Sequence, residues 1–150
     1  MLKLKDIIEL KAIDSSNRLS FATRYLVQVN FTFDLTVKSD LFSGTAHFCV
    51  RKDELEKLCN ELNKMTESFN GACRLQDNDS DGFIEFAIGS TRKVGIYGQL
   101  GGTHEDNFMQ YKFTSDLSAT ETFIAGMTKL LTHVDNAEYE KEYNLKYKQK

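Results

Sequence analysis

Residues 26–38, LVQVNFTFDLTVK, decide the fold because apolar and polar side chains alternate along the whole stretch. A period of two places successive side chains on opposite faces of a β-strand. One face of this stretch carries Val27, Val29, Phe31, Phe33, Leu35 and Val37. The pattern predicts a half-buried antiparallel strand, with the apolar face toward a core and the polar face toward water.

The alternation continues on both sides of this stretch. After Ser39 and Asp40, residues 42–50 repeat it, which predicts a hairpin with residues 26–38. A first strand is predicted over residues 2–13. Farther along, four short strands are expected near residues 72–76, 83–89, 93–100 and 108–114, separated by turns rich in Asp, Gly and Ser. These four strands are predicted to form a meander.

Two helices interrupt this strand pattern. At Asp53 the period changes to about 3.6, with Asp53 and Glu56 as a start signal and Asn70-Gly71 as a stop. A second helix is predicted from about Ser118, where Ser118 and Glu121 form a capping box. The apolar stripes of the two helices are Leu55, Leu58, Cys59, Leu62 and Met65, and Phe123, Ile124, Met127, Leu130, Leu131 and Val134.

The length of 150 residues predicts one domain over residues 1–150. Its tail, residues 135–150, is expected to be a helical or flexible extension, with tyrosines spaced four residues apart. The expected fold is α+β. An antiparallel sheet of six or seven strands, a long N-terminal hairpin followed by the meander, carries both helices on one face.

Charge and cysteine content narrow the functional classes. The net charge of −3 argues against direct nucleic-acid binding, and residues 53–85 hold nine acidic residues against three basic ones. The three cysteines form no Cys-x-x-Cys pair, so we expect reduced thiols. Charged residues within the first 13 positions argue against a signal peptide or membrane span. We expect a cytoplasmic protein with no membrane association.

The string Asp77-Asn-Asp-Ser-Asp-Gly82 copies the start of an EF-hand calcium loop. The position of the bidentate Glu is occupied by Ile88, and the following residues look like a strand. Asp and Gly at these positions also suit a tight polar turn. We therefore expect a hairpin turn that does not bind calcium tightly.

Known catalytic patterns find no support in the sequence. His47 and Cys49 share a predicted strand face, roughly 6–7 Å apart, which is too far for a nucleophile and its base. His104 and His133 have no metal-ligand spacing, and Gly98-Gln-Leu-Gly-Gly102 precedes a strand rather than a helix. We expect no enzymatic activity, no cofactor and no metal site.

Three stretches resemble a known family. They are Phe42-Ser-Gly44 leading into Phe48-x-Val50, DELEKL at residues 53–58, and YKFTSDL at residues 111–117, which runs into the second helix. With the order of elements, they make the chain similar to the WapI-like bacterial immunity proteins up to about Leu131. The resemblance implies a cytoplasmic antidote that binds and neutralises a co-encoded toxin domain, often a nuclease, of a polymorphic or contact-dependent toxin.

An acidic sector suits an inhibitor of this kind, because a toxin that holds nucleic acid is itself basic. The residues expected at the rim or centre of the partner interface are Asp77, Asp79, Asp81, Glu85, Tyr97, Glu105, Asp106 and Tyr111. The sequence leaves two alternatives open. They are a small enzyme or metabolite-binding domain, and a structural calcium-binding module.

Overall fold

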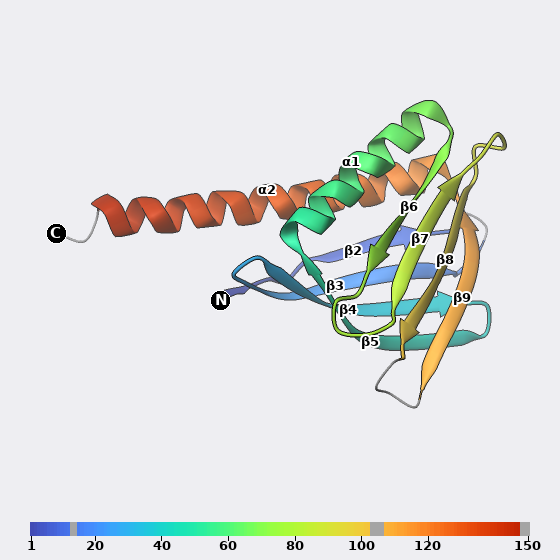
Figure 1. Ribbon diagram of the computed structural model, residues 1–150, viewed down its shortest axis with the longest axis horizontal. Coiled ribbons are helices and arrows are strands. Elements are labelled where there is room, and N and C mark those ends of the chain that lie inside the picture. Colours follow the sequence, from blue (N-terminus) through green and yellow to red (C-terminus); the bar gives the residue numbers. More distant parts are fainter. Residues whose placement is uncertain (13–14, 103–106, 148–150) are drawn as a thin grey trace.

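The computed structural model describes residues 1–12, 15–102 and 107–147, with side chains described as far as Ala137. Within these residues the chain forms two antiparallel sheets and two helices (Figure 1). In chain order, the elements are β1 Leu2–Lys3, β2 Ile7–Lys11, β3 Arg18–Val27, β4 Asn30–Ser39, β5 Phe42–Arg51, α1 Lys52–Ser68, β6 Gly71–Gln76, β7 Phe83–Ile88, β8 Val94–Gly101, β9 Phe108–Ser115 and α2 Leu117–Tyr147.

The first sheet contains β1 to β5. Its strands pair in the order β1-β3-β4-β5, and β2 pairs with β3 beside β1. One face is buried through Phe21, Phe33, Leu35 and Phe48, whereas Arg24, Asp34 and His47 lie on the opposite face. This separation is the physical consequence of the two-residue period in the sequence.

The strands of this sheet differ from the sequence prediction in three ways. The strand predicted over residues 2–13 is divided into β1 and β2, and residue 13 lies outside the described residues. Residues 26–38 are not one strand, because β3 ends at Val27, β4 begins at Asn30, and Gln28 has a φ of 56°. Val27 and Val29 continue the apolar alternation, but they flank this turn and are 40% and 44% exposed. A bulge between Thr23 and Tyr25 shifts the alternation within β3, which hid this strand from the pattern.

The second sheet is the predicted meander, in the order β6-β7-β8-β9. Each of its strands begins and ends within one residue of the prediction. The α+β class, the antiparallel strands and the helices packed on sheet are therefore confirmed. The strands divide into sheets of five and four, where the sequence suggested one sheet of six or seven.

Both helices bury the stripes that the sequence predicts, but their caps lie elsewhere. In α1 the Glu54 carboxylate accepts the Arg51 N–H at 3.2 Å, so the cap lies two residues before the predicted Asp53–Glu56 pair. In α2 the Asp116 carboxylate accepts the Ala119 N–H at 2.6 Å, which replaces the predicted Ser118 cap. An ion pair between Lys52 and Asp135 joins the two helices.

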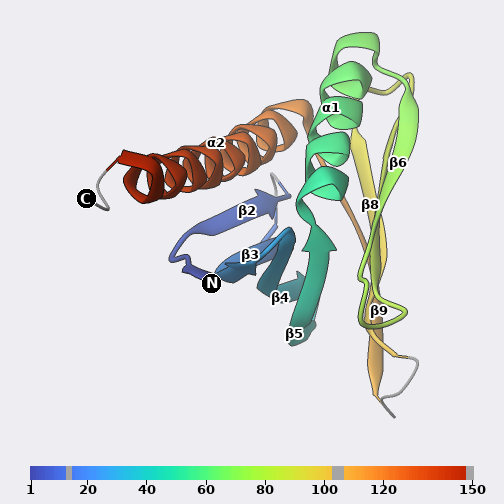
Figure 2. The same ribbon diagram turned by 60° about the vertical axis from the view of Figure 1, so that its left-hand side comes forward.

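The two sheets meet at an angle, and the helices close the opening between them (Figure 2). Helix α2 packs on β2, and α1 packs on α2 and β6. Phe123 of α2 is fully buried between Phe21 of β3 and Phe86 of β7, with ring centroids 5.7 Å and 6.0 Å away. One aromatic side chain thus connects the helix layer to both sheets.

Neither helix, over the residues that the structure describes, combines the length and apolar character that crossing a membrane requires.

Candidate partner-binding surface

The EF-hand-like string forms the turn between β6 and β7, as the sequence predicts. Asp77 is only 4% exposed, and its carboxylate accepts three hydrogen bonds. The donors are the N–H of Cys49 at 3.0 Å, the N–H of Asp79 at 3.0 Å and the hydroxyl of Ser80 at 2.5 Å. Asp77 therefore holds the turn together and is not part of an exposed interface, contrary to the sequence expectation.

Backbone hydrogen bonds close the same turn and attach it to β5. The Asn78 N–H donates to the Cys49 carbonyl at 2.9 Å, and the Asp77 N–H donates to the Gly82 carbonyl at 2.9 Å. Asn78 also donates its side-chain amide to Glu54 of α1 at 3.0 Å. This anchoring leaves Asp79 and Asp81 exposed on a turn of fixed position. We call residues 77–82 the acidic turn.

We expect the acidic turn to bind calcium weakly or not at all. A calcium ion needs six to eight oxygens, and both Asp77 oxygens already accept protein hydrogen bonds. Ile88, at the position of the missing Glu, is buried in β7. Calorimetric titration of the full chain should give no dissociation constant below about 10 μM, the range of calcium sensors, and a tighter value would contradict this prediction.

His47 and Cys49 have different partners in the structure. His47 bonds to Asp34 at 3.0 Å rather than to the thiol. Burial, with a hydrogen bond to Asp79 as the next cause, raises the pKa of Cys49 to about 11. The thiol is therefore protonated at neutral pH, which opposes a nucleophilic role. All three cysteines are free thiols, as expected.

Two predicted interface residues, Glu85 and Tyr97, face each other across β7 and β8. Tyr97 is 41% exposed, and its ring lies 5.5 Å from the ring of Phe83, which Arg74 covers at 3.7 Å. The outer face of the second sheet thus carries an aromatic side chain beside a carboxylate. Both residues are accessible to a partner.

Tyr111 does not belong to this surface. It is 3% exposed, and its hydroxyl donates to the Phe83 carbonyl at 3.3 Å across Gly98. Burial raises the pKa of Tyr111 well above its usual value. The prediction of an interface anchor was wrong here because Tyr111 points to the inner face of the sheet. Glu105 and Asp106 lie outside the described residues.

Three of the exposed apolar side chains that the sequence did not place at an interface lie at the β4–β5 turn and at the start of β9. Leu41, Phe42 and Phe108 are 98%, 72% and 62% exposed. Phe42 and Phe108 line opposite sides of a groove of about 530 Å³ between β5 and the β8–β9 end of the second sheet, which we call the edge groove. Phe42 was read as part of a buried strand face, but it directly follows a turn, where the sheet no longer covers it.

The acidic turn approaches the same end of the second sheet. A Cβ placed on Gly102 would lie 3.6 Å from the Cβ of Asp81, and the neighbouring Gly101 lines the edge groove. The structure therefore brings Asp81 toward the groove that contains Phe108. Of the acidic residues on α1, Glu54 also meets the acidic turn through its hydrogen bond with Asn78, whereas Glu56 and Glu67 are exposed on the helix.

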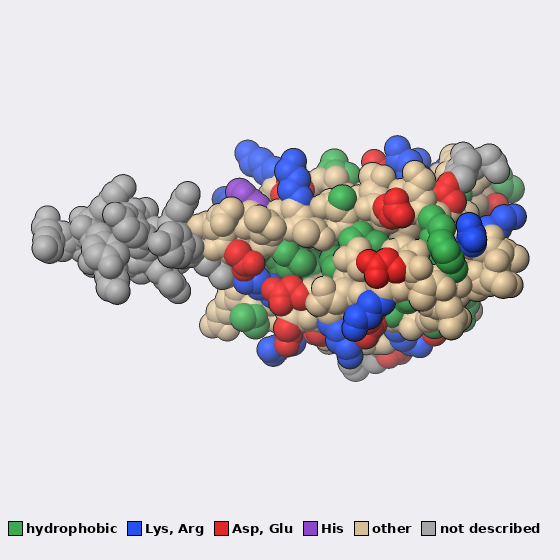
Figure 3. Space-filling view, turned by 90° about the horizontal axis from the view of Figure 1, so that it is seen from above, with side chains coloured by type: hydrophobic (Ala, Val, Ile, Leu, Met, Phe, Trp, Pro, Cys, Tyr) green, Lys and Arg blue, Asp and Glu red, His purple; other side chains and the backbone are tan. Residues whose placement is uncertain are grey.

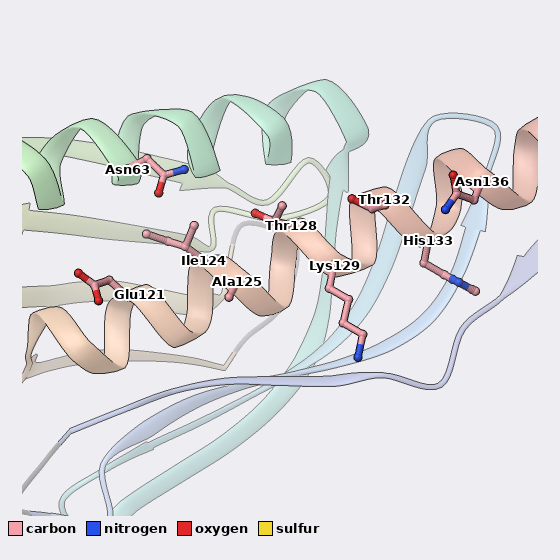
Figure 4. Close-up of a pocket in the computed structure, with 9 residues that line it drawn as sticks. All are labelled: Asn63, Glu121, Ile124, Ala125, Thr128, Lys129, Thr132, His133 and Asn136. Carbon is pink, nitrogen blue, oxygen red and sulfur yellow. The ribbon is translucent and has the colours of Figure 1, made fainter.

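The helix side of the molecule has a different character. Acidic and basic side chains are interspersed there, with small apolar patches between them (Figure 3). A groove of about 750 Å³ runs along α2, and Asn63 points toward it from α1 (Figure 4). Lys129 and His133 point away from α1, so the polar groups do not converge on one point (Figure 4). This arrangement lacks the convergent polar groups typical of a small-molecule site.

Across the part of the chain that the structure describes, no three His, Cys, Asp or Glu side chains are grouped so that they could hold a metal ion. Comparison with known proteins adds no assignment: no protein family, curated protein or solved structure matches the chain.

Proposed function

We propose that the chain is a non-catalytic immunity protein that binds and neutralises a basic toxin domain encoded beside it. The observation that carries the proposal is the exposed aromatic pair Phe42 and Phe108, which lines a groove next to the acidic turn. The resemblance to WapI-like immunity proteins supports the same class.

Exposed aromatic residues favour a protein partner on energetic grounds. Burying an aromatic side chain removes a large apolar area from water, and aromatic residues are common among those that dominate binding energy. Asp79 and Asp81 supply a negative rim, which attracts a positively charged partner and accelerates association. A toxin that acts on nucleic acid needs a basic surface. The exposed aromatic residues and the negative rim together therefore fit such a partner.

Growth protection tests this proposal. The toxin-like domain encoded nearest to the gene is expressed in a bacterial host, with and without the full chain. We expect growth arrest by the toxin alone and normal growth when both are present. A Phe42→Ala/Phe108→Ala variant should protect poorly, whereas Lys57→Ala on α1 serves as the control and should protect fully. Failure of the wild-type chain to protect against this domain contradicts the proposal.

Charge reversal in the acidic turn should slow binding. Asp79→Lys/Asp81→Lys replaces two negative charges on the rim with two positive ones, so we expect an association rate at least tenfold lower and less sensitive to salt. Glu56→Lys/Glu67→Lys on α1 changes the net charge equally and is the control, because both glutamates are exposed on the helix. Stopped-flow measurements of binding to the toxin domain at several salt concentrations give the association rate and its salt dependence. Equal rates for the two variants would place the interface elsewhere.

A further inference from the structure

Strand β5 is an end strand whose outer edge is open over part of its length. Among the described strands it pairs only with β4, and Ser39 and Phe42 flank the two-residue turn that joins them. In an antiparallel pair, the backbone groups of successive residues point alternately toward the neighbour and away from it. Counting from Phe42, Ser43, Thr45, His47 and Cys49 therefore direct their N–H and C=O groups outward.

The contacts of Cys49 confirm this alternation. Its N–H donates to the Asp77 carboxylate at 3.0 Å, and its carbonyl accepts the Asn78 N–H at 2.9 Å, so the acidic turn already occupies the edge there. At Ser43, Thr45 and His47, no other described residue hydrogen bonds to the outward backbone groups. The acidic turn thus ends where the open edge begins.

Among the described residues, this open edge lacks the features that normally prevent pairing with another chain. Edge strands are usually protected by a bulge, a proline, a lysine or a covering element. The β4–β5 register runs without a bulge, the chain has no proline, and residues 42–47 read FSGTAH. By contrast, the outer edge of β9 is covered at Lys112, whose carbonyl accepts the Ser39 hydroxyl at 3.2 Å.

The edge groove runs along this open edge. Residues 42–46 form one side, and Leu100, Phe108 and Met109 form much of the other. A strand added to β5 would therefore satisfy the outward backbone groups and bury alternate side chains against apolar residues. Ser43 and His47 span roughly 14 Å at 3.4 Å per residue, which fits a segment of about five residues.

One end of the open edge is apolar and the other is acidic. This difference defines the chemistry of the segment that would bind there. Phe42 lies at the start of β5, with Phe108 across the edge groove, whereas the exposed Asp79 lies beyond His47, next to Cys49. Asp79 is close enough to the Cys49 thiol to influence its pKa. A segment that is apolar at one end and basic at the other complements both ends.

We propose that β5 binds an extended segment of the partner by β-strand addition, with apolar side chains in the edge groove and Lys or Arg beside the acidic turn. This inference rests on the proposed function for the identity of the partner, and it specifies how the partner is recognised. Antiparallel addition, the more stable arrangement, places the amino-terminal end of the segment at the Cys49 end of β5, where the acidic turn is attached.

The test uses a substitution that removes one outward N–H and no hydrogen bond to β4. Thr45→Pro does this, because proline is tolerated at outward-facing positions of edge strands. Thr45→Ala is the matched control. Both variants lose the hydroxyl contact with Thr36, which is 2.8 Å long in the native strand pair, but Thr45→Ala retains the N–H. Thermal melting of both variants shows whether the fold is intact.

The probe is the synthetic peptide Lys-Lys-Thr-Val-Thr-Phe-Thr-Val, with Glu-Glu replacing Lys-Lys in a second peptide. Binding to the full chain is followed by NMR, together with amide hydrogen exchange. We expect the Lys peptide to bind at least tenfold more tightly than the Glu peptide and to slow exchange at Ser43, Thr45 and His47. Thr45→Pro should weaken binding at least tenfold, and Thr45→Ala less than twofold.

Three outcomes overturn the inference. The first is that the Lys peptide does not bind at millimolar concentration. The second is that it binds a folded Thr45→Pro variant as tightly as the wild-type chain. The third is a wild-type dimer that Thr45→Pro dissociates, because this result assigns the edge to a second copy of the chain. The growth-protection assay distinguishes failure of this inference from failure of the proposed function. Full protection by a folded Thr45→Pro variant rejects strand addition alone, whereas peptide binding without toxin protection rejects the proposed function alone.

Discussion

Phe123→Ala should lower the free energy of unfolding by about 3–5 kcal/mol, which corresponds to a fall of roughly 6–20 °C in the melting temperature. The phenyl ring of Phe123 is fully buried and contacts both Phe21 and Phe86. Its removal leaves a cavity where α2 and the two sheets meet. Because the two rings beside the cavity, Phe21 and Phe86, belong to different sheets, they cannot close it by moving together.

Thermal melting and urea unfolding of the full chain measure this effect. The control is Phe108→Ala, which removes the same side chain from a site that is 62% exposed. We expect this variant to change stability by less than about 0.5 kcal/mol. Equal stability of the two variants would contradict the packing described here.

Gly98→Ala should be the second severe substitution, with a loss of about 2–4 kcal/mol. A Cβ on Gly98 would lie 2.5 Å from Cζ of Tyr111 and would also overlap the carbonyl oxygen of Phe83. Tyr111 must then leave its place, and its hydroxyl loses the buried hydrogen bond to Phe83. We expect a lower melting temperature and increased exposure of Tyr111, measurable by tyrosine fluorescence.

Gly95→Ala on the same strand is the matched control. A Cβ there lies 3.7 Å from its nearest neighbour, the Ala87 carbonyl oxygen, which is ordinary van der Waals contact. This variant should be as stable as the wild-type chain, or slightly more stable because alanine restricts the unfolded chain. If Gly98→Ala and Gly95→Ala had the same melting temperature, the side chain of Tyr111 would not cross over Gly98.

Much of the fold could be predicted from the sequence because burial imposes a local period. Leu58 and Leu62 of α1 repeat at helical spacing, and Ile84 and Phe86 of β7 repeat at strand spacing. The turn between β3 and β4 escaped prediction, because Val27 and Val29 continue the apolar alternation through it. Periodicity reports which residues are apolar, and it does not report where the backbone reverses.

The candidate surface was harder to predict, because it depends on contacts between distant segments. Asp77 and Asp79 look alike in the sequence, but only Asp77 meets the backbone of Cys49, 28 residues earlier. Tyr97 and Tyr111 lie on neighbouring strands and face opposite sides of one sheet. The edge groove arises only where β5 meets the end of the second sheet, so no local pattern encodes it.

Calorimetric titration with the purified toxin domain encoded beside the gene, for the wild-type chain and a folded Phe42→Ala/Phe108→Ala variant, measures whether the edge groove binds the toxin. We expect one-to-one binding by the wild-type chain and an affinity at least about 100-fold lower for the variant, because each substitution removes an exposed aromatic ring of the groove. Absence of wild-type binding, or equal affinity of the two proteins, would contradict this prediction.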